Sequence, residues 1–196
     1  MESLTKNRLK LVFITLLFAL PVMSAWFVYK NPQLLEGAKT KNYGELISPA
    51  VPSLLEDFIS NPEQEQLEHL KGRWLMLHID LDGRCNDECA KSVHTMRQLN
   101  VLLNKDSDRL KRVYLDMSKA AGVESRSDFS TDKDLNVFNW AKPQIDKLQG
   151  LVPGFVDGDI LLLDPLGNIM MKYQQAADPY GVQKDLKLLL KASQIG

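Results

Sequence analysis

The longest uncharged stretch of the sequence, Leu11–Tyr29, separates a candidate membrane segment from the rest of the chain. Its 19 residues lie between Lys10 and Lys30. At about 1.5 Å rise per residue, a helix of this length crosses roughly the 30 Å hydrocarbon core of a bilayer. Trp26 and Tyr29 come near its end, where aromatic side chains gather at a membrane surface. We therefore predict a transmembrane helix over residues 11–29.

A cleaved signal peptide is the alternative for the same segment. The apolar core of a signal peptide has ~7–15 residues and is followed by a small-x-small cleavage site. The observed run is longer, and Met23 occupies a position before Ala25 where such a site needs a small residue. The sequence therefore favours an anchor that is retained.

Basic residues on both sides of the run bear on its orientation. The three between positions 6 and 10 lie closer to the run than the three between positions 30 and 41. Basic residues close to a span favour the cytoplasmic side, so we predict that the N-terminus is inside. The protein would then sit in the inner (cytoplasmic) membrane with its C-terminal domain on the periplasmic side, where cysteines can cycle through a disulfide.

The remainder of the chain is long enough for one domain of ordinary size. We divide the sequence into an N-terminal tail (1–10), the transmembrane helix (11–29), a linker (30–43) and a folded domain (44–196). The formal net charge is -1, and lysine and arginine are scattered, so no nucleic-acid partner is expected. No phosphate-binding glycine loop or nucleophilic serine motif occurs, which leaves nucleotide-binding and hydrolase functions without support.

Apolar patterning in the domain predicts a mixed α/β sheet covered by helices. Trp74–Leu81 is almost unbroken apolar sequence, typical of a strand buried on both faces. A helix is expected after Cys85, capped by Asn86 or Asp87, because apolar residues follow at helical spacing. The other expected elements are a strand at 113–116, a helical region at 134–148, a hairpin at 159–173 and a helix at 179–191. Residues 31–60 are expected to be irregular, 61–70 a short surface helix and 118–133 a loop.

Cys85 and Cys89 are the only cysteines, and we predict that they form a redox or metal-binding pair. A disulfide over so short a loop constrains the unfolded chain little, so a purely structural role is disfavoured. A helix N-terminus stabilises a thiolate through its unpaired amides and its partial positive charge. Two such sulfurs can form a disulfide or hold a soft ion such as Cu(I). Zinc is disfavoured because a structural zinc site needs four ligands.

The three histidines are weaker candidates for metal ligands. His78 alternates with apolar residues along the expected strand, so a core position is the simpler interpretation, with a third metal ligand as the alternative. His69 lies among glutamates and is expected to be solvated. His94 lies about 140° around the helix from Cys89, which keeps it away from the pair.

The segments WLMLHIDLDGRCNDEC and VDGDILLLDPLGN, with the amphipathic helix between them, resemble the Sco/SenC branch of the thioredoxin-like superfamily. The resemblance covers most of residues 40–193. It implies a thioredoxin-like mixed sheet flanked by helices and preceded by one transmembrane helix. Sco proteins are implicated in delivering copper to cytochrome c oxidase, or in reducing the cysteines of its copper site.

In Sco proteins a C-x-x-x-C motif binds copper together with a distant histidine. The resemblance matches Cys85 and Cys89 to the two cysteines, and Asp157 to the acidic residue before the histidine. Two departures matter: Gly158 stands where the histidine is expected, and Ala90 replaces the proline that usually follows the second cysteine. A third ligand would then come from His78 or from a partner, unless two sulfurs hold Cu(I) or the pair does redox work alone.

These observations leave three functions open. The first is an assembly factor for a respiratory (cytochrome c) oxidase, whose partner is a membrane-embedded oxidase subunit or another periplasmic thiol protein. The second is a general membrane-tethered thiol–disulfide oxidoreductase, in which Cys85 attacks and Cys89 resolves the mixed disulfide. The third is a thioredoxin-like binding module with idle cysteines.

Overall fold

The computed structural model describes residues 2–31, 42–58, 68–124, 129, 131–193 and 195. The chain forms two compact units, one of residues 1–41 and one of residues 42–196. The two units are treated separately below.

The described part of the first unit holds one long helix, α1 (Glu2–Lys30), with Pro21 inside it. Within its segment Lys6–Lys30, the most apolar window of 18 residues has a mean hydropathy of 2.3, and none of that window is buried against the protein. A helix this apolar on all sides has the length and composition of a membrane span. The predicted helix over 11–29 is therefore confirmed.

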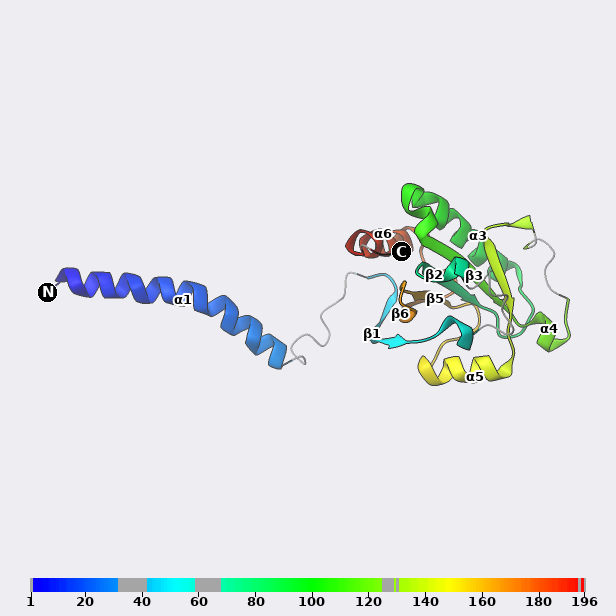
Figure 1. The fold of residues 1–196 in the computed structure, drawn as a ribbon, viewed down its shortest axis with the longest axis horizontal. Coiled ribbons are helices and arrows are strands. Elements are labelled where there is room, and N and C mark those ends of the chain that lie inside the picture. The colour runs from blue at the N-terminus through cyan, green and yellow to red at the C-terminus, as the bar shows by residue number, and fades with distance from the viewer. Residues whose placement is uncertain are drawn as a thin grey trace. The chain divides into compact units, whose positions relative to one another are not determined.

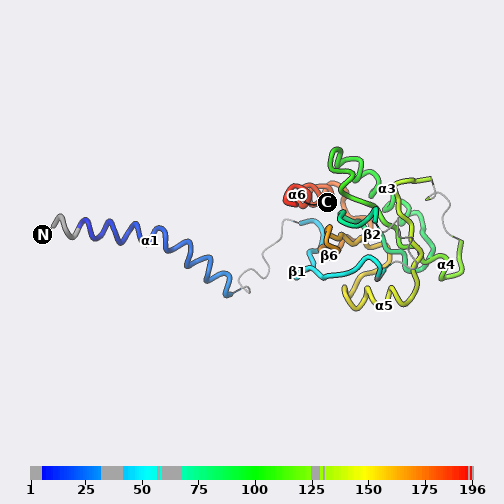
Figure 2. The backbone as a smooth tube through the Cα atoms, viewed as in Figure 1, coloured from blue at the N-terminus to red at the C-terminus, as the bar shows by residue number. Residues whose placement is uncertain are grey.

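The second unit is built on a six-stranded mixed sheet with the strand order β1-β6-β5-β2-β3-β4 (Figures 1 and 2). β2 pairs with β3 in parallel and with β5 in antiparallel fashion, while β5 pairs with β6 and β6 with β1 in antiparallel fashion. We call the edge where β2 ends and β1 begins the carboxyl edge of the sheet. The strands are β1 (Glu45–Pro52), β2 (Trp74–Ile79), β3 (Leu110–Asp116), β4 (Leu135–Asn139), β5 (Ile160–Leu163) and β6 (Asn168–Tyr173).

Helices cover both faces of this sheet, as Figure 1 shows. α3 (Asp87–Leu102) and α6 (Pro179–Ala192) pack on one face, and α5 (Lys142–Leu151) packs on the other. The remaining short elements are η2 (Leu55–Asp57), η3 (Asn104–Arg109) and α4 (Ser118–Ala121). This arrangement confirms the mixed sheet flanked by helices that the sequence predicts.

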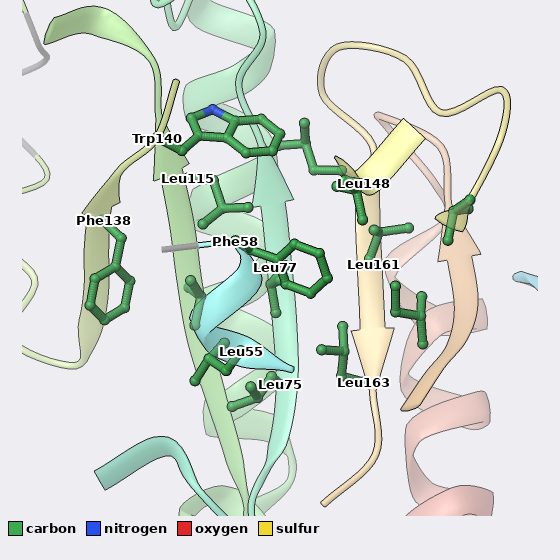
Figure 3. Close-up of a cluster of buried hydrophobic side chains, with 14 of the residues drawn as sticks. Leu55, Phe58, Leu75, Leu77, Leu115, Phe138, Trp140, Leu148, Leu161 and Leu163 are labelled. Carbon is green, nitrogen blue, oxygen red and sulfur yellow. The ribbon is translucent and has the colours of Figure 1, made fainter. Parts of the chain in front are cut away.

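β2 lies at the centre of the core because every one of its six residues is buried. Side chains alternate across a strand, so Leu75 and Leu77 face the α5 layer while Met76 and His78 face the α3 layer. Figure 3 shows the α5-side cluster, in which Phe58, Trp140 and the leucines of β2, β3 and β5 converge. Burial on both faces explains why this strand is an almost continuous apolar run.

Two regions differ from the sequence prediction. Residues 45–52 form β1 rather than an irregular segment, because pairing with β6 provides the hydrogen bonds that local sequence does not predict. Its prolines are tolerated because β1 is an edge strand, which pairs with a neighbour on one side only. Residues 135–139 form β4 rather than the start of a helix, because they pair in parallel with β3. Only the later part of that predicted helix exists, as α5.

The other predicted elements stand closer to the structure. The strand predicted at 74–81 forms over Trp74–Ile79, and the helix after Cys85, the hairpin and the last helix are confirmed. Most of the surface helix expected at 61–70 lies outside the described residues, and residues 68–70 are helical. The expected loop at 118–133 contains the short helix α4.

A buried ion pair fixes the segment before β4. The Arg112 guanidinium donates to both carboxylate oxygens of Asp132, at 2.7 and 2.9 Å, and the Arg112 side chain is only 2% exposed. These hydrogen bonds lower the pKa of Asp132 below its usual value. A lone buried charge is costly, so each partner depends on the other.

Replacing Asp132 with alanine should therefore destabilise the protein by about 3–5 kcal/mol, because Arg112 keeps its charge without a partner. Urea unfolding of the full chain in detergent measures the loss. Because the folded pKa of Asp132 is lowered, the penalty should be complete above pH ~4 and should fade as the pH drops through the folded value. Asp146→Ala is the matched control, since the Lys142–Asp146 pair is exposed, and it should cost at most about 0.5 kcal/mol. Equal losses for the two variants would contradict the assignment.

Candidate redox site

The cysteine pair lies at the carboxyl edge, where the loop after β2 leads into α3. Cys85 lies in the loop and Cys89 in the first turn of α3. The two sulfurs are joined in a disulfide, with 5.2 Å between the Cα atoms. Cys85 is partly exposed, whereas Cys89 is only 5% exposed. One sulfur can therefore be reached by a partner, and the other is covered.

Asn86 caps the helix between the two cysteines. Its side-chain oxygen accepts hydrogen bonds from the amides of Glu88, at 2.9 Å, and Cys89, at 3.0 Å. This cap, one of the two that the sequence predicts, fixes the first turn of α3 next to the disulfide. The partial positive charge of a helix N-terminus stabilises a thiolate when the pair is reduced.

Asp80 ties the cysteine loop to the sheet. Its Oδ1 accepts hydrogen bonds from the amides of Gly83, at 2.7 Å, and Asp82, at 3.2 Å, and its Oδ2 accepts one from the Tyr114 hydroxyl at 2.9 Å. The Asp80 carbonyl also accepts a bond from the indole N–H of Trp140 at 2.8 Å. Tyr114 packs in the same buried cluster as Cys89. Asp80 therefore connects the loop before Cys85 with the side chains that cover Cys89.

Burial raises the pKa of Asp80, against the opposing effect of its hydrogen bonds from Tyr114 and Gly83. Asp80, Asp82 and Asp157 also bring carboxylate oxygens within 4.8 Å of one another. Asp157 accepts a hydrogen bond from the Leu81 amide at 2.7 Å, which links the segment before β5 to the same loop. The sequence analysis missed Asp80 as a site residue, although a carboxylate at the end of an apolar strand was the available signal.

Gly158 lies beside this loop in a backbone conformation that favours glycine, with φ 82°. Its amide donates to the Ile79 carbonyl at 2.9 Å, which places it at the end of β2. A Cβ at this position would come within 2.6 Å of the Gln175 side chain. The space that a side chain at position 158 would need is therefore filled by Gln175.

His78 is completely buried, and neither ring nitrogen has a hydrogen-bond partner among the described residues. Its ring lies 5.5 Å from that of Tyr114, and burial lowers its pKa to about 4. The other two histidines are exposed, and His94 lies next to Gln98 one turn along α3. The expected core position of His78 matches its burial.

A family model described as "Transmembrane-like, thioredoxin-like, C-terminal domain" matches residues 74–193, more than half of the chain. The chain belongs to this family. No curated protein matches it.

Sco proteins are among the solved structures that resemble this family member. Apo Sco1 from Thermus thermophilus has a TM-score of 0.55 at 14% identity, covering 76% of this chain and 96% of that one. ScoI from Arabidopsis thaliana, with copper bound, has a TM-score of 0.51 at 13% identity, covering 64% and 89%. Yeast Sco1 has a TM-score of 0.50 at 16% identity, covering 64% and 84%. At these identities the likeness establishes a shared thioredoxin-like fold of the Sco type, and α1 has the length and composition of a membrane span.

A three-donor copper site does not fit the residues of this thioredoxin-like protein. Among the described residues, the one group of three or more potential ligands within 4.8 Å is the aspartate group, and it includes neither cysteine nor His78. Position 158 offers no donor, and Gln175 fills the space beside it. The reduced cysteines therefore supply two sulfur donors, and the described residues place no third His, Asp or Glu ligand in a group with them.

Replacing His78 with alanine should leave the Cu(I) affinity of the reduced protein unchanged, because His78 joins neither cysteine in a group of three potential ligands among the described residues. Anaerobic titration against a competing chelator, with the Cys85→Ser, Cys89→Ser double variant as the copper-free reference, measures this. A loss of Cu(I) affinity greater than 100-fold in the His78 variant would restore it as a ligand, since changes to residues around the ligands alone reach 10–100-fold.

Asp80→Asn should lower the pH at which the Cys85 thiol is half-alkylated by about half a unit, because a negative charge near the thiolate is removed. Asparagine keeps the shape of the side chain and can still accept the Gly83 bond while donating to Tyr114. Iodoacetamide labelling against pH in the Cys89→Ser background measures the shift. Asp108→Asn, on η3 at the opposite edge, is the control and should leave the curve in place. Coincident curves for Asp80→Asn and its parent would remove Asp80 from the electrostatics of the site.

Proposed function

We propose that this protein is a membrane-anchored assembly factor for a respiratory (cytochrome c) oxidase that acts by thiol–disulfide exchange on a partner. The observation that carries the proposal is the Cys85–Cys89 disulfide at the start of α3, with one sulfur accessible and the other covered. The oxidase as target follows from the likeness to Sco proteins. The exchange chemistry follows from the pair itself.

The chemistry needs only the two cysteines and the partner's sulfurs. In the reduced protein, the Cys85 thiolate attacks a partner disulfide, forming a mixed disulfide and releasing one partner thiolate. The Cys89 thiol then loses its proton and attacks Cys85, which forms the internal disulfide and releases the second partner thiolate. Two electrons pass to the partner, and a dithiol of another protein must reduce the pair again.

The unequal exposure of the two sulfurs supports different tasks for them. Cys85 precedes the helix and is partly exposed, so it is the sulfur that a partner can reach more easily. Cys89 is held by the Asn86 cap within the cluster that contains Tyr114, so it stays covered until the mixed disulfide forms. Asp80 acts as a positioning residue, because its bonds to the loop amides set the path of the chain into Cys85.

Copper remains a second candidate cargo for the same pair. Solved ScoI from Arabidopsis thaliana and yeast Sco1 hold copper, and two thiolates suit Cu(I). The missing third donor favours exchange over metal transfer in this chain. General oxidoreductase activity and a binding role with idle cysteines are the remaining alternatives, and a trapping experiment separates them.

The membrane is proposed to be the inner membrane, with the domain on the periplasmic side. This rests on the basic residues between positions 6 and 10, which lie close to the uncharged run 11–29 on its N-terminal side. An oxidising compartment would allow the disulfide to persist.

Cys89→Ser should trap the partner as a mixed disulfide with Cys85, because the resolving sulfur is gone. Purification from membranes under non-reducing conditions, followed by mass spectrometry, identifies the adduct. An oxidase subunit in the adduct supports the proposed role, and many unrelated proteins would indicate the general oxidoreductase. Cys85→Ser is the matched control and should give no adduct, since Cys89 is covered. Complete rescue of oxidase activity by the double-serine variant in a deletion strain would instead indicate idle cysteines.

A further inference from the structure

The chain enters the folded unit at the same edge of the sheet that carries the disulfide. β1 begins at Glu45, which pairs with Lys172 near the end of β6. β6 and β2 run in the same direction, because each is antiparallel to β5. The start of β1 therefore lies at the carboxyl edge, together with the end of β2 and the loop to Cys85.

This point of attachment is held by specific contacts. One carboxylate oxygen of Asp185, which is 2% exposed, accepts hydrogen bonds from the amides of Tyr43 and Gly44, both at 2.9 Å. The Tyr173 hydroxyl donates to the same oxygen at 3.3 Å. The Lys184 ammonium lies 5.2 Å from the centre of the Tyr43 ring. The chain is thus fastened to the sheet and to α6 from Tyr43 onward.

Distances along the chain then limit how far the disulfide can move from the anchor. Eleven residues, 31–41, separate the end of α1 from Asn42, and they span at most about 40 Å when fully extended. β1 and β2 are three strand spacings apart, which is about 14 Å across the sheet. The turn between β5 and β6 lies at the opposite edge of the sheet. Measured along the strands, this turn is about 20 Å from the carboxyl edge.

We propose that this attachment confines the Cys85–Cys89 pair to a layer within roughly 60 Å of the membrane, so that its partner is a protein whose reacting cysteines lie close to the membrane surface. The cysteine-bearing edge is the tethered one, and the β5–β6 turn is the free one. The choice of partner rests on the proposed exchange function, whereas the confinement of the edge does not.

Energy transfer to the membrane tests the confinement without any partner. The full chain, with both native cysteines changed to serine, carries a donor dye on Arg84→Cys or on Leu166→Cys; both native side chains are exposed. Each variant is placed in phosphatidylcholine and phosphatidylglycerol vesicles with acceptor dye on the headgroups. The dye at position 84 should lie nearer to the acceptors, by about 10–20 Å, because it is on the tethered edge. Equal transfer, or stronger transfer from position 166, would overturn the proposal.

A longer linker provides the matched comparison. Thirty glycine and serine residues inserted after position 36 raise the mean span of the connection from about 18 to about 35 Å, so transfer from position 84 should fall. The same insertion at the C-terminus should change nothing.

The partner class is tested by the Cys89→Ser trap, with the domain either anchored or released by a protease site placed within residues 32–41. Release should reduce the yield of the mixed disulfide at least tenfold if the partner lies at the membrane. An unchanged yield with a soluble partner would overturn the partner class while leaving the exchange function intact. Absence of any mixed disulfide in the anchored protein would overturn the exchange function, and the energy-transfer result would still stand.

Discussion

The pairing of β2 with β3 on one side and β5 on the other is the constraint on which the rest of the domain depends. All six residues of β2 are buried, and its two faces complete two different hydrophobic clusters. A strand so enclosed has one register, because a slip of a single residue would exchange its two faces. The register fixes where the strand ends, and this places Asp80 and the cysteine loop at the carboxyl edge. The site is therefore positioned by the core.

Sequence reasoning succeeded where the signal was local. The buried strand, the Asn86 cap and the hairpin turn around Gly167 each follow from residues that are close together in the chain. It failed for β1 and β4, whose strands form because distant strands provide the hydrogen bonds. Propensity is a weak guide for such segments, since tertiary pairing overrides it. The sequence alone indicated that Cys85 and Cys89 form a pair. The hydrogen bonds that link Asp80 to Tyr114 and Trp140 join positions far apart in the sequence, so only the structure reveals them.

Gly158 and Gln175 distinguish this chain from a three-donor metal protein. A side chain at position 158 would have to adopt the left-handed backbone of Gly158 and displace the Gln175 amide that packs there. The fold of the Sco type is thus retained, while position 158 carries no donor and Gln175 occupies the space beside it. One fold can host different chemistries when a few positions around a shared motif change. Here those positions leave two sulfurs, a helix N-terminus and a buried carboxyl group.

The contact between Asp185 and the start of the folded unit also decides where the domain can be cut. Any soluble version that begins after Gly44 removes both amide donors from a carboxylate that is 2% exposed. A buried acceptor that loses its donors costs about 1–3 kcal/mol for each bond, and more when it is charged. The first residues after the linker thus belong to the domain's polar core. A truncated protein made for crystallisation or metal titration should therefore keep Tyr43. A shorter protein would be less stable than the full chain.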